Sequence, residues 1–326
     1  MDRATYIKIR HSLNLEQEVS ALPIYLLQNA ALILGIIFLW RQFEGSWIRY
    51  LGGPFVSVFM FRSFGVMHEA VHNAVSKNKF INDAVGIVSG AVGLFPYETW
   101  RKSHLSHHHW SGNVEKDSVM GLVLAVPKMS LQSQRFLSRI WKTWFPILAI
   151  LQHVVFWQIS LKIYRQNVGS IKVLMSLVAP ILFWGTLLLM APLEFSLGVL
   201  GPALFLFFVA IEVVNLPHHL QLPQFRGEEK FPAWQQYLTV RSCAYPKWIA
   251  RFVVLNFNYH IEHHMFPDVP WYHLDKLHGP VRQALGDSYN IDPYFRWILE
   301  NKPKDIVAVL APEEINNTSS QVERVS

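Results

Sequence analysis

Histidine is concentrated in four short segments of this 326-residue chain. Eleven of its 15 histidines lie there: His68 and His72; His104, His107, His108 and His109; His218 and His219; His260, His263 and His264. On a helix, residues i, i+3 and i+4 share a face, so HxxxH should aim two imidazoles at one point and HxxHH three. Neutral imidazole commonly binds zinc, iron, copper and nickel, and one zinc site needs three or four protein ligands. The clustered histidines outnumber the ligands that one metal needs, which predicts two metal ions held almost wholly by histidine.

Spacing also selects ligands within the clusters. One helix cannot aim three consecutive histidines at one metal, so His109 is the expected outsider of its cluster. His219 lies four residues after Asn215 and shares its helical face, which favours His219 over His218 as a ligand. The solitary histidines are interpreted as surface or satisfied core residues: His11, His153, His273 and His278.

The elements that position these clusters are expected to be membrane helices. The chain is 51% hydrophobic, contains 12 Trp, 11 Tyr and 22 Phe, and has a positive mean hydropathy. Its net charge of +6 is typical of cationic loops near lipid head groups, and we expect no nucleic-acid partner. The single cysteine, Cys243, excludes an intramolecular disulfide. The polar start of the chain predicts no cleavable signal peptide.

Four uncharged or nearly uncharged runs are long enough, alone or with their continuation, to cross a bilayer: residues 22–40, 51–61, 173–193 and 195–211. If all the clusters build one site, an even number of spans must separate residues 104–109 from residues 260–264, so one of the three candidates between them does not cross. Residues 145–161 contain polar side chains that would be costly to bury in lipid, so this segment is interpreted as an interfacial helix. Residues 84–97 are too short to span and are expected to be interfacial or re-entrant.

The prediction is therefore an all-α integral membrane protein with two transmembrane helical hairpins, or four spans, and a helical cap that holds the di-metal site. Lys and Arg gather on the side of the histidines, which the positive-inside rule makes cytoplasmic, together with both termini. The expected organisation is a cytosolic N-terminal segment at 1–21, a membrane domain at 22–305 and a flexible C-terminal tail at 306–326.

The ordered clusters resemble the three histidine boxes of the membrane fatty acid desaturase superfamily, which read HxxxH or HxxxxH, HxxHH and HxxHH. Here they are His68-Glu69-Ala70-Val71-His72, His104-Leu105-Ser106-His107-His108 and His260-Ile261-Glu262-His263-His264. Asn258-Tyr259 before the last box, Met265-Phe266-Pro267-Asp268-Val269-Pro270 after it, and Asn215 with His219 extend the resemblance over roughly residues 20–300. The HxxxH form of the first box is more similar to acyl-lipid desaturases, sphingolipid desaturases and carotenoid-modifying relatives than to acyl-CoA stearoyl desaturases, which have HxxxxH.

The resemblance implies a non-heme di-iron centre that activates O2 and introduces a double bond into the acyl chain of a lipid. It implies nine iron ligands: His68, His72, His104, His107, His108, His219, His260, His263 and His264. No catalytic residue is expected beyond the ligands. Side chains beside the ligands should orient the imidazoles: Glu69, Asp117, Glu212, Glu262 and Asn215. The HPGG heme motif of fused cytochrome b5 domains is absent, so the implied electron donor is a separate protein, of ferredoxin or cytochrome b5 type with a reductase.

Three alternatives remain at this stage. The same ligand set could serve a hydroxylase or ketolase acting on a lipid or carotenoid, because substrate placement decides the outcome. The segment from His68 to His72 also matches HExxH of zinc metallopeptidases, with Glu69 as the general base, but this leaves both HxxHH boxes unexplained. A metal carrier or sensor is the non-enzymatic alternative.

Overall fold

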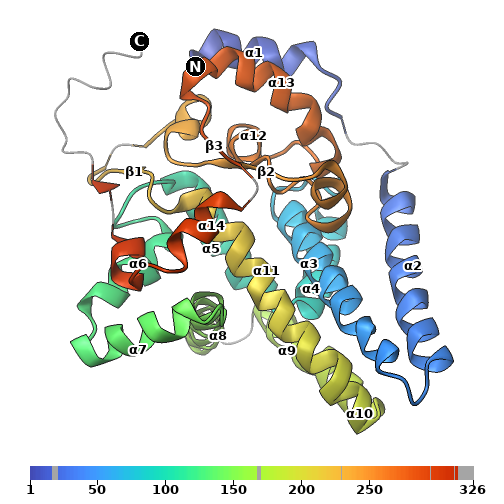
Figure 1. Cartoon of the computed structure of the whole chain (residues 1–326). Coiled ribbons are helices and arrows are strands. Elements are labelled where there is room, and N and C mark those ends of the chain that lie inside the picture. Colours follow the sequence, from blue (N-terminus) through green and yellow to red (C-terminus); the bar gives the residue numbers. More distant parts are fainter. Residues whose placement is uncertain (17–20, 167–169, 229, 294, 312, 315–326) are drawn as a thin grey trace.

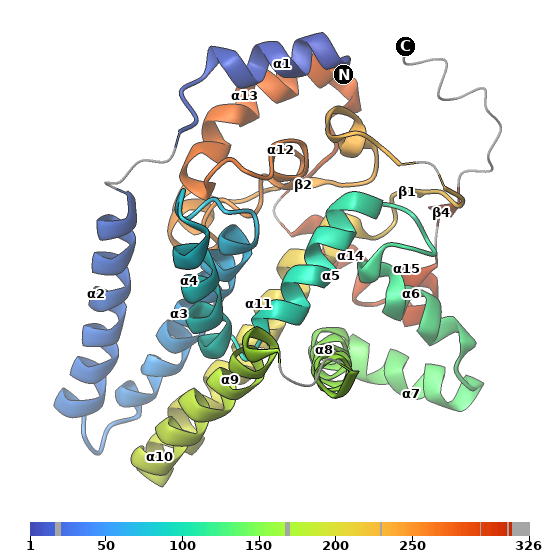
Figure 2. The ribbon, with the colours of Figure 1, turned by 180° about the vertical axis from the view of Figure 1, so that it is seen from behind.

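Helices account for almost all the regular structure in the computed structural model, which describes residues 1–16, 21–166, 170–228, 230–293, 295–311 and 313–314. Figure 1 shows long helices extending in one direction from a layer of shorter elements that includes the N-terminus. Figure 2, the reverse view, shows the same division. The expected helical architecture with four candidate membrane spans is confirmed.

The long helices are arranged as the expected hairpins. The first hairpin consists of α2 (Ala21–Gln42) and α3 (Gly52–Val71), joined through a 3₁₀ turn at Trp47–Leu51. The second consists of α9 (Ile171–Met190), followed by α10 (Leu193–Phe195), a π-helical turn (Ser196–Leu200) and α11 (Gly201–His219). Helix α3 packs against both α2 and α11, which joins the two hairpins.

The membership of the four candidate spans differs from the expected one. By length and composition they are Pro23–Gln42, Ile147–Gln166, Ile171–Met190 and Leu193–His219. The set includes α8 (Ile147–Gln166), expected at the interface, and leaves out α3, which is largely buried from Met60 onward. Both figures view α8 almost end-on, while α2, α3, α9 and α11 run lengthwise through the picture. Composition therefore admits α8 as a span, although it lies across the direction of the two hairpins.

The segment expected to be interfacial or re-entrant forms a sharp bend. Helices α4 (Lys79–Val92) and α5 (Tyr97–Trp110) meet at 105°, and by the same criteria they could form a fifth, broken span. Two glycines permit the close approach at the bend. A Cβ at Gly86 would overlap the ring of Tyr97, and one at Gly90 would lie 2.8 Å from the carbonyl oxygen of Phe95.

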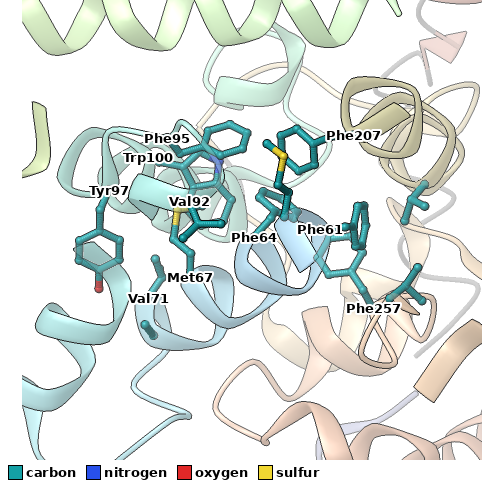
Figure 3. Close-up of a cluster of buried hydrophobic side chains, with 14 of the residues drawn as sticks. Phe61, Phe64, Met67, Val71, Val92, Phe95, Tyr97, Trp100, Phe207 and Phe257 are labelled. Atoms are coloured by element: carbon teal, nitrogen blue, oxygen red, sulfur yellow. The ribbon is translucent and has the colours of Figure 1, made fainter. Parts of the chain in front are cut away.

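A large aromatic core holds α3 against α5, the helices that carry the first two boxes. Figure 3 shows side chains from these helices packed together with residues of α4, α11 and the segment before the third box. In this core, the ring centre of Phe64 lies 5.6 Å from that of Trp100 and 6.0 Å from that of Phe257. The core residues labelled in Figure 3 are Phe61, Phe64, Met67, Val71, Val92, Phe95, Tyr97, Trp100, Phe207 and Phe257.

The remaining elements form the cap and one flank of the molecule. Helix α1 (Arg3–Ser12) packs on α13 (Leu274–Leu285), beside the short α12 (His260–Met265) that carries the third box. The flank contains α6 (Gly121–Ala125), α7 (Leu131–Lys142) and α14 (Arg296–Asn301). Further 3₁₀ or π turns lie at Ser118–Met120, Val126–Lys128, Ala233–Leu238, Ile249–Val253, Trp271–His273 and Gly286–Ser288.

Two parallel strand pairs add a little β-structure to the cap: β1 (Pro223–Gln224) with β4 (Glu313–Glu314), and β2 (Ser242–Ala244) with β3 (Ile291–Pro293). The region expected to be a flexible tail begins instead with α15 (Ile306–Leu310). Its Ile306, Val309 and Leu310 are buried against α6 and α7, which explains why this part is ordered. Residues 315–326 lie outside the described residues.

Candidate metal centre

Nine imidazoles converge in the interior as two neighbouring groups. The first imidazole group contains His68, His72, His104, His108 and His263. The second imidazole group contains His107, His219, His260 and His264. In each group, one ligand atom from every member lies within 4.8 Å of all the others. These are the nine histidines that the sequence nominated, and four helices bring them together: α3, which ends at Val71 just before His72, and α5, α11 and α12.

The spacing argument predicted that each HxxHH box aims its three imidazoles at one metal, and this prediction is wrong. His104 and His108 belong to the first group, while His107 between them belongs to the second. In the third box the pattern is reversed, since His260 and His264 lie in the second group and His263 in the first. An α-helix turns about 100° per residue, so i and i+4 differ by about 40°, whereas i+3 and i+4 differ by about 100°. Each HxxHH box therefore serves both groups.

In the first group, the Nε2 atoms face one another at contact distance. His104 Nε2 lies 2.9 Å from His72 Nε2 and 3.0 Å from His108 Nε2, which in turn lies 3.0 Å from His263 Nε2. His68 Nε2 is buried and has no hydrogen-bond partner among the described residues. A neutral imidazole has one bare nitrogen and one N–H, and one cation could accept the bare nitrogens of all five rings.

Hydrogen bonding fixes the tautomers of two rings in the second group. His107 Nδ1 donates to the carboxylate of Asp117 at 2.8 Å, and His264 Nδ1 donates to Gln236 Oε1 at 3.0 Å. The orientation of Gln236 is set by its amide N–H, which donates to the His108 carbonyl. Both neutral rings therefore present bare Nε2 atoms, which face each other at 3.2 Å. Two lone pairs repel at this distance unless a cation lies between them, so the donor set fits a bound metal.

Burial keeps the third-box imidazoles in the form that binds metal. It lowers the pKa of His260, His263 and His264 well below the usual 6.5, and repulsion from neighbouring imidazoles adds to the effect. These rings are neutral at pH 7, with lone pairs available for coordination.

The side chains expected to orient the imidazoles divide into two kinds. Asp117 does so directly, because one oxygen accepts from His107 and the other accepts from the Gly112 N–H at 3.1 Å. Glu69 lies 3.7 Å from His68 Nδ1 while accepting the Trp271 N–H at 2.8 Å. Gln236, which the sequence reading missed, holds His264. It lies 28 residues before its partner, and no local spacing marks it.

Glu262 and Glu212 contact other groups instead. Glu262 is buried and accepts hydrogen bonds from Ser242, His278 and Tyr289 at 2.7–2.9 Å. None of these three residues belongs to either imidazole group. Glu212 binds Lys302 at 2.7 Å, close to the start of α8. Both carboxylates contact other groups, so the expectation that they orient ligand imidazoles is wrong.

The histidines expected to be outsiders do lie outside both groups. His109 is exposed against Trp110, and His218 is buried with Nδ1 donating to the Arg241 carbonyl at 2.7 Å. Asn215 donates to the Ile211 carbonyl at 2.8 Å and lines the cavity described below. His278 binds Glu262, and His153 accepts from Trp157 Nε1 at 3.2 Å.

A mainly apolar cavity of about 120 Å³ opens onto both imidazole groups. Its wall includes His68 and His104 from the first group and His107, His219 and His260 from the second. Much of the remaining wall is aliphatic or aromatic and comes from the bend before α5 and from α5, α8 and α11: Phe95, Trp100, Leu148, Phe156, Ile211 and Leu216. A hydrocarbon chain in this cavity would lie against both candidate metal positions.

The geometry argues against the zinc-peptidase alternative. His68 and His72 share their group with three further imidazoles, more than the three protein ligands of a catalytic zinc. Glu69 is buried, and one of its oxygens already accepts the backbone N–H of Trp271. The structure therefore places the HExxH segment within a larger histidine site.

Comparison with known proteins agrees with this site. The family model described as fatty acid desaturase matches residues 45–295. The omega-6 fatty acid desaturase, chloroplastic, of Arabidopsis thaliana is 26% identical over 263 residues, which cover 77% of this chain and 57% of the relative. The sn-1 oleoyl-lipid 12-desaturase of Synechocystis is 25% identical over 308 residues, covering 90% of this chain and 83% of the relative.

The sn-1 acyl-lipid omega-3 desaturase (ferredoxin) of Nostoc is 25% identical over 281 residues, which cover 79% of this chain and 74% of that relative. The chain spans 54–57% of the length of four chloroplast relatives that it matches. The family model nonetheless covers all three histidine boxes and most of the chain. This chain belongs to the fatty acid desaturase family.

Proposed function

We propose that this protein is an O2-dependent di-iron oxidoreductase that introduces a double bond into the acyl chain of a membrane lipid. The observation that carries the proposal is the apolar cavity whose wall contains imidazoles of both groups. A long hydrocarbon needs extended apolar walls to be held in one register, and aromatic and aliphatic side chains of α5, α8 and α11 supply them. Family membership supports the reaction class.

The nine imidazoles of the two groups would hold the metals, with Asp117 and Gln236 keeping bare nitrogens directed inward. Two iron ions bound there would supply the O2 activation needed to remove hydrogen from an unactivated C–H bond; zinc has no redox chemistry. The chain itself contributes placement, because the cavity wall decides which pair of carbons lies beside the histidines. It also excludes water, since most members of both groups are buried.

In this proposal, α2, α3, α9 and α10–α11 cross the membrane, and α8 lies along its surface. The support is the lengthwise direction of the two hairpins, with α8 directed across them. The concentration of Lys and Arg beside the histidines supports a cytoplasmic location for that side and for both termini. Reporter fusions at the two ends should both read cytosolic, and a split result would refute this topology.

The electrons would come from a separate donor of ferredoxin or cytochrome b5 type. Ferredoxin is part of the name of the Nostoc relative. Omission of each donor from an assay with purified protein and lipid vesicles would identify which one supports turnover. Turnover with no added donor at all would contradict the need for a partner.

The reaction is tested by expression in a host with simple lipids, followed by mass spectrometry of the lipid extract. Desaturation removes two hydrogens from an acyl chain, whereas hydroxylation adds one oxygen. The inactive control is His264→Ala, and the matched control is His109→Ala, which changes an exposed histidine outside both groups. Unchanged acyl chains together with an oxygenated carotenoid or other isoprenoid would refute the acyl desaturase and favour the hydroxylase alternative.

A further inference from the structure

Glu212 and Lys302 form a buried ion pair outside the two imidazole groups. Lys302 Nζ lies 2.7 Å from Glu212 Oε1, and both side chains are at most 3% exposed. The ammonium also donates to the Trp141 carbonyl at 3.2 Å and lies 3.7 Å from the centre of the Trp141 ring. A buried charge is costly unless it is paired and hydrogen-bonded, and here both conditions are met. The pair therefore ties α7, α11 and the end of α14 to one point.

The second oxygen of Glu212 acts on the first turn of α8. It accepts the backbone N–H of Leu148 at 2.9 Å and of Ala149 at 3.3 Å. The first N–H groups of a helix have no partner within the helix, and a negative charge is favourable at its N-terminus. A carboxylate on α11 thus caps α8, and Lys302 neutralises the buried charge of that carboxylate.

The capped turn is part of the cavity wall. Leu148 and Ala149 line the cavity, as do Gln152, His153 and Phe156 further along α8. On α11, Ile211 precedes Glu212 and Leu216 follows it, and both line the same cavity, as does the candidate ligand His219. The Glu212 cap therefore attaches the first turn of α8 to the helix that carries His219. A helix rises about 1.5 Å per residue, which is comparable to the spacing of successive carbons in an extended chain.

We propose that Glu212 is a positioning residue, with Lys302 neutralising its buried charge, and that its cap on α8 selects which carbons of the acyl chain reach the imidazole groups. Apolar packing alone permits small sliding of a helix, whereas two backbone hydrogen bonds to one carboxylate specify a single position. The inference rests on the proposed desaturase function and adds the determinant of double-bond position. It predicts that loss of the cap redistributes the product among positional isomers rather than only lowering turnover.

The test compares two double variants that remove both charges and differ in one hydrogen-bond acceptor. Lys302→Met with Glu212→Gln keeps an oxygen for the α8 N–H groups, whereas Lys302→Met with Glu212→Leu does not. The readout is the ratio of the main positional isomer to its neighbours, measured by mass spectrometry of the acyl chains, with iron per chain measured on purified protein. Glu300→Gln, which breaks the exposed Arg296–Glu300 pair, is the surface control.

The Gln-containing double variant should keep the wild-type isomer ratio. The Leu-containing one should lose at least about tenfold in that ratio at unchanged iron content, since a misplacement of about 1 Å can cost about 10²-fold. Ala149→Pro removes one of the two donors in the first turn of α8, where the N–H has no partner within the helix, and should lower the ratio in the same direction. This variant provides the comparison if the Leu variant does not accumulate.

The outcomes separate the two proposals. A wild-type protein that forms no double bond refutes the proposed function, and this inference falls with it. An active wild type whose isomer ratio is unchanged in both the Leu-containing variant and Ala149→Pro refutes the positioning role alone. A fall in total product with an unchanged ratio likewise refutes it, because that is the behaviour of a residue that only stabilises the fold.

Discussion

Replacement of Asp117 by Asn should weaken metal binding in the second imidazole group. The buried carboxylate accepts two N–H groups, from His107 Nδ1 and Gly112, with one oxygen for each. Asn has a single oxygen, so one N–H must lose its acceptor, at a cost of about 1–3 kcal/mol. If the Asn NH2 group faces His107, the ring must move its proton to Nε2, and this removes the lone pair that faces His264. Mutation of a residue that orients a metal ligand typically lowers metal affinity by about 10–100-fold, or about 1.4–2.8 kcal/mol.

The assay is a chelator titration of the iron-loaded protein with iron counted per chain. Wild type should retain both irons over a chelator range in which Asp117→Asn releases one, because the first group does not include His107. Asp287→Asn, at an exposed position, is the matched control and should behave as wild type. Equal resistance to chelator in Asp117→Asn and wild type would refute the argument that this carboxylate sets the tautomer of His107.

Three further predictions follow from burial and geometry. Alanine at any one of five candidate ligand positions should abolish turnover at normal expression: His72, His107, His108, His263 and His264. Activity retained above about a tenth of wild type would exclude that imidazole as an essential ligand. Burial raises the pKa of the Cys243 thiol to about 12, so a maleimide should leave the native protein unlabelled at pH 8 and label it after denaturation; rapid native labelling would contradict the burial. The metal-free protein should be most stable above about pH 7 and lose stability as pH falls through 6.5, because the unfolded chain takes up protons there that His260, His263 and His264 cannot accept while buried; a midpoint of thermal unfolding that is unchanged between pH 7.5 and about 5.5 would contradict this.

The candidate site was largely predictable because helical spacing carries its main information. All nine members of the two groups were nominated from the i, i+3 and i+4 pattern, with His109 and His218 set aside. The division between groups was not foreseen, although the 100° turn per residue contains it. Gln236 could not be found, because its contact with His264 depends on how the turn at Ala233–Leu238 packs against α12.

The same limit applies to the carboxylates and to the fold. The sequence places Glu212 and Glu262 close to histidines, but which way each side chain points depends on tertiary neighbours such as Lys302 and Tyr289. Hydropathy located three of the long hairpin helices: α2, α9 and α11. It could not decide between α8 and α3, because a buried helix and a lipid-facing helix have similar composition. The order of 306–310 likewise comes from packing partners distant in sequence.

The splitting of each HxxHH box between two groups has a consequence for how the protein matures. Neither group is complete until α12 has been synthesised, since both draw on the third box, and the contact between His68 and His263 joins segments far apart in the chain. Metal ions bound by these groups would therefore load after all the long helices have been synthesised, and their binding free energy would be added at the last step of folding. Because α5 and α12 each contribute to both groups, the first ion to bind would order rings that the second requires, which would favour loading in pairs.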